Sequence, residues 1–437
     1  MKNQVLKSFL FIALISPLSI HSQSWEKCGF NLATSKMELK HPGYQTQIDN
    51  VLKRNLENKS DNKLRLSQTI LRIPVVVHVV YENATENLDD SLIYNQIEVL
   101  NEDFRRLNSD AVNTRSEFLD VAADTYIEFE LASTDPDGNP TNGITRTETT
   151  ETSFMDFSLT FDLMKKTATG GIDAWPTNKY LNIWVCDLSV SFAGQSIPAI
   201  YGYAYPPSGL SNWPGPSQTP TDTTLEGVVI HYQGFGRNNP YGIQIVGTDT
   251  MRTDRGRTAT HEVGHYLGLR HVWGDGPCNE DDFMDDTPKM AGQSNFDCDT
   301  TINSCVDTLI DLPDMIENFM DYSAESCQNA FTQDQANLMY NVLLNERSDL
   351  PTPIYPASTN QKKLKSWKIY PNPARKHIFV EGDAKSIELF ELNGKLIRNI
   401  TNYSNPIDLS LLPNGIYIMK LTDKNENQIF TKLISIH

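Results

Sequence analysis

The sequence lacks any excess of positive charge. Its 437 residues include 37 Lys and Arg against 55 Asp and Glu, which gives a formal charge of −18. Phosphate backbones and anionic lipids repel so acidic a chain, so we expect neither nucleic acid nor a membrane surface as its main partner. The charge favours solubility, cation binding or basic peptide substrates, although exported proteins are often acidic whatever they bind.

Long hydrophobic runs are also missing beyond the N-terminus, so the sequence predicts no transmembrane helix. The chain starts with Lys2 and Lys7, followed by the apolar run SFLFIALISPLSI at residues 8–20 and the polar HSQS. This run is too short to span a bilayer but has the form of an export signal. We predict a signal peptide over residues 1–23, removed near residues 22–24, and hence an exported protein in which disulfides persist.

Cysteine is scarce, and none of the six cysteines forms a CxxC pair, which argues against a structural zinc site. Cys278, Cys298, Cys305 and Cys327 lie close together in the sequence. In an exported chain such a cluster predicts two disulfides, for which the spacing alone allows three connectivities. Cys186 lies in the apolar run YLNIWVCDL and is expected to be an inert buried thiol.

The chain is too long for one average domain, and its composition divides it into segments. Residues 24–68 are polar and rich in Lys and Asn, with weak helical periodicity, as expected for a pro-segment or a flexible leader. A main domain is predicted over residues 69–350, followed by a proline-rich linker at residues 351–361. Residues 362–437 contain short strands separated by turn signals, including an Asn-Gly pair at residues 393–394, and predict a small all-β sandwich.

Apolar patterns predict four strands in the main domain, in IPVVVHVVYE, YIEFELAS, KYLNIWVCDL and EGVVIHYQGFG. The first, from Ile73, is expected at the centre of the sheet, and EGVVIHYQG at its edge, where an extended peptide can pair with it. Helical spacing predicts an amphipathic helix over residues 90–107, capped by Asp89 or Asp90, and a second helix near residues 332–344. Because strands alternate with helices, the expected fold class is a mixed α/β sheet.

The most informative stretch is HEVGHYLGLRH, from His261 to His271. In a helix, His261 and His265 project from one face, so their imidazoles can bind the same Zn²⁺. Gly268 accepts the left-handed conformation that ends a helix, after which His271 can return as the third ligand. Three protein ligands leave one tetrahedral position open to water, as a catalytic zinc requires. Glu262 is then placed to take a proton from that water as general base.

We expect Asp254 or Thr253 to cap the start of this helix. The histidines and Glu262 could also be ordinary polar residues, but a chance match to all fixed positions of HExxHxxGxxH is rare. The stretch resembles the elongated motif of the metzincin metallopeptidases.

A second metzincin feature lies downstream, in NFMDY at residues 318–322. It resembles the methionine-containing turn of that group, and together with the cysteine cluster it is similar to the pappalysin family over residues 71–350. The resemblance implies a catalytic metzincin domain, with a mixed twisted sheet and an active-site helix, that hydrolyses peptide bonds. It also implies that Met320 forms an apolar floor under the zinc ligands, and that Tyr322 stabilises the negative charge developing on the substrate oxygen.

The resemblance further implies a disulfide pairing and a second metal site. In pappalysins the first cysteine of the cluster pairs with the third and the second with the fourth, which gives Cys278–Cys305 and Cys298–Cys327. The loop NEDDFMDDTP is strongly acidic, and its oxygen ligands suit Ca²⁺. The positions that match a calcium site best are Asp282, Asp285 and Thr287. A solvated acidic loop is the alternative.

Cys28, followed by Gly29, lies in the predicted pro-segment. A thiolate is a strong zinc ligand, so this cysteine can displace the catalytic water and keep the protein latent, as in similar metzincins. A lipid-anchor cysteine or an unused thiol is the alternative. An anchor cysteine would directly follow the cleavage site, whereas Trp25, Glu26 and Lys27 intervene here.

Substrate preference has a weaker signal. Pappalysins can select a basic residue after the cleaved bond through an acidic side chain shortly before the last cysteine of the cluster. Glu325 could serve here, although Ser326 stands next to Cys327, where the acid is expected. A preference for Arg or Lys is therefore a hypothesis. His231 is expected at the edge of the cleft and not among the metal ligands.

The C-terminal unit resembles the sorting domain of the type IX, or Por-type, secretion system. The matching features are YPNP at residues 370–373, the hairpin ELFELNGKLI and the segment LPNGIYIMKL. The resemblance implies passage across an outer membrane by secretion machinery, after which the domain is removed. A carbohydrate-binding or adhesive β-sandwich is the alternative.

Together these features predict a secreted zinc-dependent endopeptidase, made as a latent proenzyme, that acts on proteins or peptides. A non-catalytic, zinc-bearing adhesin or binding protein is the alternative from a different class. Glu262 distinguishes the two, because a binding module has no use for a catalytic base.

Overall fold

The chain forms two compact units in the computed structural model, residues 1–354 and 355–437. The structure describes residues 27–57, 69–156, 158–192, 195–207, 223–243, 253–294, 296, 298–307, 311–354, 368–381, 384–391, 395–401, 404–423 and 428–435. The predicted signal peptide, most of the predicted linker and the Asn-Gly pair at 393–394 lie outside these residues. None of the helices in the described ranges is long and apolar enough to cross a membrane.

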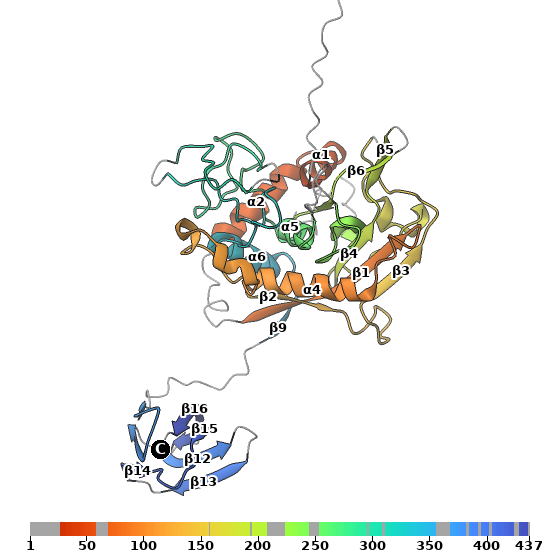
Figure 1. The fold of residues 1–437 in the computed structure, drawn as a ribbon. Coiled ribbons are helices and arrows are strands. Elements are labelled where there is room, and N and C mark those ends of the chain that lie inside the picture. The colour runs from red at the N-terminus through yellow and green to blue at the C-terminus, as the bar shows by residue number, and fades with distance from the viewer. Residues whose placement is uncertain are drawn as a thin grey trace, which may run out of the picture. The chain divides into compact units, whose positions relative to one another are not determined.

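A mixed sheet forms the framework of the first unit, in the order β2-β1-β4-β8-β7, with β3 and β9 also paired to β1 (Figure 1). Its strands are β1 Ile70–Tyr81, β2 Ile127–Leu131, β3 Ile144–Glu148, β4 Leu181–Cys186, β7 Gly202–Ala204, β8 Val228–His231 and β9 Thr352–Ile354. β2, β3 and β4 pair parallel to β1, and β8 pairs parallel to β4, whereas β7 and β9 are antiparallel to their neighbours. The apolar run of β1 is central, as predicted.

The predicted edge strand is wrong. β8 lies between β4 and β7, and all four of its residues are buried, as expected of an interior strand covered on both faces. The edge strand is β7, whose three residues GYA are too few for any alternation to be visible in the sequence.

Helices cover this sheet and link it to the N-terminal segment. They are α1 Phe30–Lys40, α2 Tyr44–Glu57, α4 Asp90–Phe104, α5 Arg257–Tyr266 and α6 Gln333–Asn345. Asp89 caps α4 by accepting the N–H of Ser91 at 2.8 Å, and Thr332 caps α6 in a capping box with Gln335. α5 packs against α4, β7 and β8, which places it beside the edge strand.

The predicted pro-segment is helical over much of its described length. α1 packs on β7, and α2 packs on α6. The periodicity of α2 is visible in the sequence, because Tyr44, Ile48, Val51 and Leu52 form one buried face. At the other end of the unit, the first residues of the predicted linker instead form β9.

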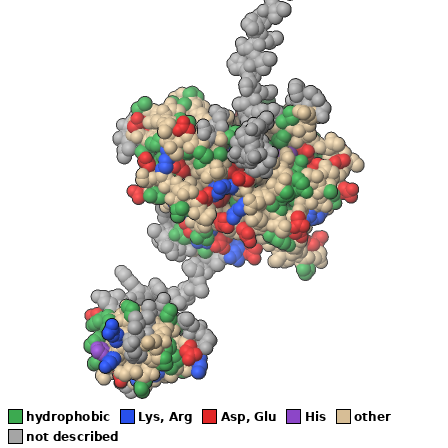
Figure 2. Space-filling model, in the orientation of Figure 1, with side chains coloured by type: hydrophobic (Ala, Val, Ile, Leu, Met, Phe, Trp, Pro, Cys, Tyr) green, Lys and Arg blue, Asp and Glu red, His purple; other side chains and the backbone are tan. Residues whose placement is uncertain are grey.

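Shorter elements complete the first unit. They are η2 Ser109–Asn113, η3 Ser116–Phe118, η4 Leu163–Lys165, η5 Thr167–Thr169, η7 Thr223–Leu225, η8 Tyr232–Gly234 and the hairpin of β5 Ser189–Phe192 with β6 Gln195–Pro198. Acidic side chains are spread over the face of this unit seen in Figure 2, with basic ones among them.

The second unit is all-β. Its sheets have the orders β10-β11-β14 and β13-β12-β15-β16. The strands are β10 Lys368–Tyr370, β11 His377–Glu381, β12 Ala384–Glu391, β13 Leu396–Thr401, β14 Ile407–Asp408, β15 Gly415–Asp423 and β16 Gln428–Ser435. Ile378 and Val380 from one sheet share a core with Leu389, Met419 and Leu433 from the other. The predicted sandwich is therefore confirmed.

Candidate metal centre

Three imidazoles converge at the end of α5. His261 and His265 lie on the helix, and His271 follows after the chain turns at Gly268, whose φ of 98° is the predicted left-handed conformation. Nε2 of His265 lies 3.1 Å from Nε2 of His261 and 3.1 Å from Nε2 of His271. Nitrogen ligands bound tetrahedrally to one zinc ion are about 3.3 Å apart, so the three side chains fit zinc.

Each imidazole is oriented through its second nitrogen. The Nδ1–H groups of His261 and His265 donate to main-chain carbonyl oxygens at 2.7 and 2.8 Å. Nδ1 of His271 contacts the carboxylate of Asp275. Burial lowers the pKa of His261 and of His265 well below the usual value, which favours the neutral form of both rings. With their protons on Nδ1, the rings present bare Nε2 atoms, which is the form that binds a metal.

The start of α5 is capped from a distance. The helix begins after Gly256, which has a φ of 73° and provides no side-chain cap. The predicted cap by Thr253 or Asp254 is wrong, because the N-cap position is occupied by Gly256. The Thr253 hydroxyl instead donates to the carbonyl oxygen of Gln233. The carboxylate of Glu325 instead accepts the N–H of Thr258 at 3.0 Å. Local sequence could not reveal a cap that comes from a residue so far along the chain.

Glu262 lies beside the converging imidazoles and is fully buried. Its Oε2 accepts a hydrogen bond from the thiol of Cys28 at 3.4 Å, whereas its Oε1 has no hydrogen-bond partner within the described part of the chain. Burial raises the pKa of Glu262 to about 8 and that of the Cys28 thiol well above its usual value. The Cys28 sulfur and one nitrogen from each histidine lie within 4.8 Å of one another, which makes a group of four donors suited to one ion.

The N-terminal segment covers these donors by lying along β7. Cys28 forms a parallel bridge with Gly202, and the N–H of Gly29 donates to the carbonyl of Gly202 at 2.7 Å. A Cβ atom at Gly29 would lie 2.6 Å from the end of the Ile200 side chain and 3.2 Å from Cβ of Tyr203, so glycine allows this close approach without displacing them. The ring of Phe30 stacks on His265 with centroids 4.1 Å apart.

Met320 and Tyr322 both lie next to the donors. A Cβ atom on Gly264 would lie 2.5 Å from the sulfur of Met320, so this sulfur packs directly on the backbone of α5 between the two helical histidines. The hydroxyl of Tyr322 donates to the carbonyl oxygen of Cys28 at 3.3 Å, and its ring centroid is 5.0 Å from that of His271.

Sequence reasoning missed three residues at this site. Trp273 stacks on His271 with centroids 4.3 Å apart and planes 6° from parallel, and Asp275 holds His271 while also accepting from Asn31 at 2.8 Å. Both follow the last histidine closely, where an aromatic and an acidic residue were visible in the sequence. The third, Lys27, is 2% exposed.

The ammonium of Lys27 points into a group of carboxylates. It interacts electrostatically most strongly with Glu325, and then with Asp321 and Glu262, yet it has no hydrogen-bond partner among the described residues. Burial lowers the pKa of Lys27 despite these neighbours. Glu325 is itself 1% exposed, so the candidate specificity residue lies inside the molecule, facing the N-terminal segment.

Of the three predicted calcium positions in the acidic loop, Asp282 and Thr287 lie in contact, whereas Asp285 has no contact with them among the described hydrogen bonds. The Thr287 hydroxyl donates to Asp282 at 2.9 Å, whereas Asp285 is exposed. Burial raises the pKa of Asp282 well above its usual value and that of Asp286 to about 6. Oδ1 of Asp286 has no hydrogen-bond partner among the described residues.

The cysteine cluster forms two disulfides, Cys278–Cys305 and Cys298–Cys327, the pairing that the family resemblance implied. Cys186 is a free, buried thiol. His231 is fully buried and lies outside the group of four donors, because its Nδ1 accepts the N–H of Leu188 at 3.0 Å.

Comparisons with known proteins agree with this geometry. A family model described as pregnancy-associated plasma protein-A matches residues 233–344. A model described as a secretion system C-terminal sorting domain matches residues 368–436. An extracellular metalloprotease of Arthroderma otae is 33% identical over 130 residues, which are 30% of this chain and 43% of that protein. The match thus spans less than half of that relative.

Solved structures extend the similarity over the first unit. Mature mirolysin of Tannerella forsythia, in complex with a cleaved peptide, is 40% identical, with a TM-score of 0.53 over 64% of this chain and 95% of mirolysin. A promirolysin mutant from the same organism is 37% identical, with a TM-score of 0.56 over 74% of this chain and 97% of promirolysin. The sorting domain and the extracellular relative indicate a protein that is secreted or held at the cell surface. From the mirolysin match, the chain belongs to the pappalysin family of zinc metalloendopeptidases.

Proposed function

We propose that this protein is a secreted zinc-dependent endopeptidase that is made as a latent proenzyme and hydrolyses internal peptide bonds of proteins. The observation that carries the proposal is the convergence of three oriented, metal-ready imidazoles beside the buried carboxylate of Glu262. A metal-binding adhesin would need the imidazoles but not this carboxylate.

His261, His265 and His271 would hold the zinc ion. When bound, zinc supplies a Lewis acid that acidifies water and polarises the scissile carbonyl. Oε2 of Glu262 then takes a proton from the attacking water and passes it to the leaving amine. Its position supports this role, because Oε2 faces the Cys28 sulfur at 3.4 Å, and in the latent form this sulfur would take the place of the water.

Tyr322 would stabilise the charge that develops on the substrate oxygen. In the structure its hydroxyl donates to the carbonyl oxygen of Cys28, which is a peptide carbonyl lying in the cleft. A substrate carbonyl at this position would accept the same bond, and the bond strengthens as negative charge accumulates. Met320 would support the ligands from below through its contact with Gly264.

Latency would come from the N-terminal segment. Cys28 supplies a fourth donor to the three imidazoles, and the backbone around it pairs with the edge strand β7. Substrate cannot reach the donors while this segment is docked, because Phe30 covers His265. The promirolysin structure is that of a related proenzyme.

A preference for Arg or Lys after the scissile bond is supported by Lys27. Its ammonium is buried among carboxylates, with Glu325 as its strongest electrostatic partner. A substrate side chain of the same chemistry could replace it once the N-terminal segment leaves. Cleavage of a peptide library by the processed protein would test this, and random residues after the cleaved bond would refute it.

Calcium would bind the acidic loop and stabilise it. The support is the burial of Asp282 beside Thr287 and the unpartnered Oδ1 of Asp286. Exposed Asp285 would then provide at most a peripheral ligand. Added Ca²⁺ should raise the unfolding temperature, whereas Mg²⁺ at the same concentration should have little effect. Identical thermal unfolding curves with Ca²⁺ and with Mg²⁺ would contradict a calcium site in this loop.

The main test uses casein hydrolysis by the processed protein, with Glu262→Gln as the matched variant. The substitution keeps the shape of the side chain but removes the base, so zinc content should stay at one per chain while activity falls about 1,000-fold or more. A chelator should abolish wild-type activity and added zinc should restore it. If the wild type and Glu262→Gln are equally active, the proposed base is wrong.

A further inference from the structure

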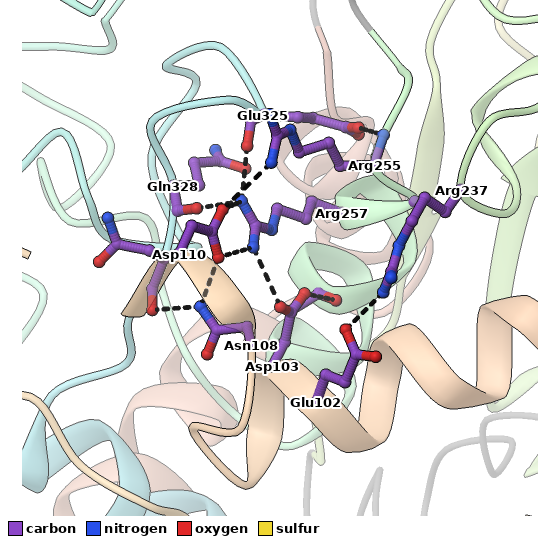
Figure 3. Close-up of polar contacts among 12 residues, drawn as sticks. Glu102, Asp103, Asn108, Asp110, Arg237, Arg255, Arg257, Glu325 and Gln328 are labelled. Carbon is purple, nitrogen blue, oxygen red and sulfur yellow. Dashed lines mark hydrogen bonds and ion pairs between the residues drawn. The ribbon is translucent and has the colours of Figure 1, made fainter. Parts of the chain in front are cut away.

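Arg257, the first residue of α5, is held by several separate segments of the first unit (Figure 3). It is 4% exposed. Its two terminal nitrogens bond both oxygens of Asp110 at 2.7 and 2.8 Å, and one of them also lies 3.3 Å from Asp103. These carboxylates offset the burial of its charge.

Two further bonds of Arg257 reach the main chain of the segment that ends at α6. The guanidinium donates to the carbonyl oxygen of Glu325 at 2.7 Å and to that of Gln328. In return, the Glu325 carboxylate accepts the N–H groups of Arg255 at 2.8 Å and Thr258 at 3.0 Å, at the positive end of α5. Each side chain therefore bonds the main chain of the other's segment, an arrangement that we name the Arg257–Glu325 clamp.

The clamp connects two parts of the site that must stay in register. α5 carries Glu262, the candidate base, and the Glu325 carboxylate is the strongest electrostatic partner of Lys27. A buried ion pair with Asp110 alone would fix α5 but would leave the Glu325 segment free to shift. The bonds from Arg257 to the two carbonyl oxygens hold the main chain of this segment, while the bonds accepted by Glu325 orient its carboxylate.

We propose that Arg257 is a positioning residue that sets the preference for a basic substrate side chain by holding Glu325 against the start of α5. This inference rests on the proposed function, because it takes Glu325 as the group that selects the basic side chain. The hydrogen-bond partners of the Arg257 guanidinium described above include none of the metal ligands. Arg257 acts through Glu325.

Arg237 provides a matched control. Both arginines line a polar cleft of about 280 Å³, together with Asp103, Asp110 and Arg255. The Arg237 guanidinium pairs with Glu102 on α4, and this pair is separate from the clamp (Figure 3). Replacing Arg237 with Lys therefore changes the same chemical group in the same cleft without loosening Glu325.

The test uses the processed protein, without its N-terminal segment, and two peptides that differ only after the scissile bond, where one has Lys and the other norleucine. The ratio of their kcat/KM values measures selection of the charge. Arg257→Lys keeps the charge but cannot bond Asp110 and both carbonyl oxygens at once. Zinc content and unfolding temperature are measured alongside.

We expect the wild type to prefer the Lys peptide about tenfold or more, and Arg257→Lys to lose most of that ratio with a smaller loss on the norleucine peptide. Asp110→Asn preserves the shape of the side chain and leaves Arg257 in place, so it should lower the ratio less. It provides the test if Arg257→Lys does not fold. Arg237→Lys should leave the ratio unchanged.

Other outcomes distinguish the role of Arg257 from the basic preference itself. Equal losses on both peptides in Arg257→Lys and Asp110→Asn, with an unchanged ratio, would make Arg257 merely structural and overturn the inference alone. A wild-type ratio near one would overturn the proposed basic preference, and the role of the clamp with it.

Discussion

Replacing Phe30 with Ala should release Cys28 from the cleft far more often while leaving the main domain folded. The Phe30 ring is 3% exposed, stacks on His265 with its plane 9° from parallel, and makes an edge contact with His271 at 5.8 Å. Truncating a buried Phe side chain costs about 3–5 kcal/mol. Phe30 is the first residue of α1, where the chain can partly close the gap, so we expect about 3 kcal/mol, the lower end of that range.

This loss falls on the docking of the N-terminal segment, because the ring joins that segment to the rest of the unit. A cost of about 3 kcal/mol multiplies the undocked fraction roughly 150-fold. Cys28 is fully buried when docked, so a thiol reagent can reach it only after undocking. The assay is the rate at which the reagent modifies Cys28 in the full chain, followed by mass spectrometry of the peptide that contains it.

Two controls test whether faster labelling of Cys28 reports undocking of the N-terminal segment. Leu39→Ala changes the same helix at a side chain that is 85% exposed, so it should leave the rate at the wild-type value. The buried thiol of Cys186, on β4 within the sheet, should stay unreactive in every variant unless the domain unfolds. If Phe30→Ala labels Cys28 no faster than Leu39→Ala does, the stacked ring contributes nothing to docking and the reasoning from burial is refuted.

Three further predictions concern stability. Thr332→Ala removes the hydroxyl that accepts the N–H of Gln335 at 3.3 Å and should cost about 1 kcal/mol in the free energy of unfolding, measured with urea. Burial raises the pKa of Asp103 from 3.8 to about 6. The folded state therefore holds this proton more tightly than the unfolded chain, so stability should fall as pH rises from about 4 to about 6; urea midpoints across that window should show a flatter decline in Asp103→Asn. Replacing both Cys298 and Cys327 with Ser opens a loop with a sequence separation of 29 residues and should lower the free energy of unfolding by about 3–4 kcal/mol, whereas an unchanged midpoint would contradict the loop-entropy argument.

The features that could be predicted from sequence are those fixed by neighbouring residues. β1 is a long, mostly apolar strand, so its sequence predicts its central place, and Asp89 caps α4 from the adjoining position. The ligand spacing of the metal centre depends on the turns of one helix and on Gly268, which are likewise local.

The features that could not be predicted depend on contacts between distant segments. The cap of α5 comes from Glu325, and only the folded chain brings the two together. β7 is too short to carry a pattern, so the sequence favours the more regular β8 as the edge strand. In the sequence Lys27 is only a spacer before Cys28, because its carboxylate partners are scattered along the chain.

The compactness of the docked segment has a consequence for inhibitor design. The four consecutive residues Lys27–Phe30 provide a basic side chain, a sulfur donor, a glycine that allows close approach to β7, and an aromatic ring that stacks on His265. A tetrapeptide mimic of this stretch would therefore carry most of the groups that block the cleft. Its weakness would be the missing anchor, since α2 and its packing on α6 would no longer hold it in place. Cyclising such a mimic would replace that anchor by restricting the free ligand to its bound shape.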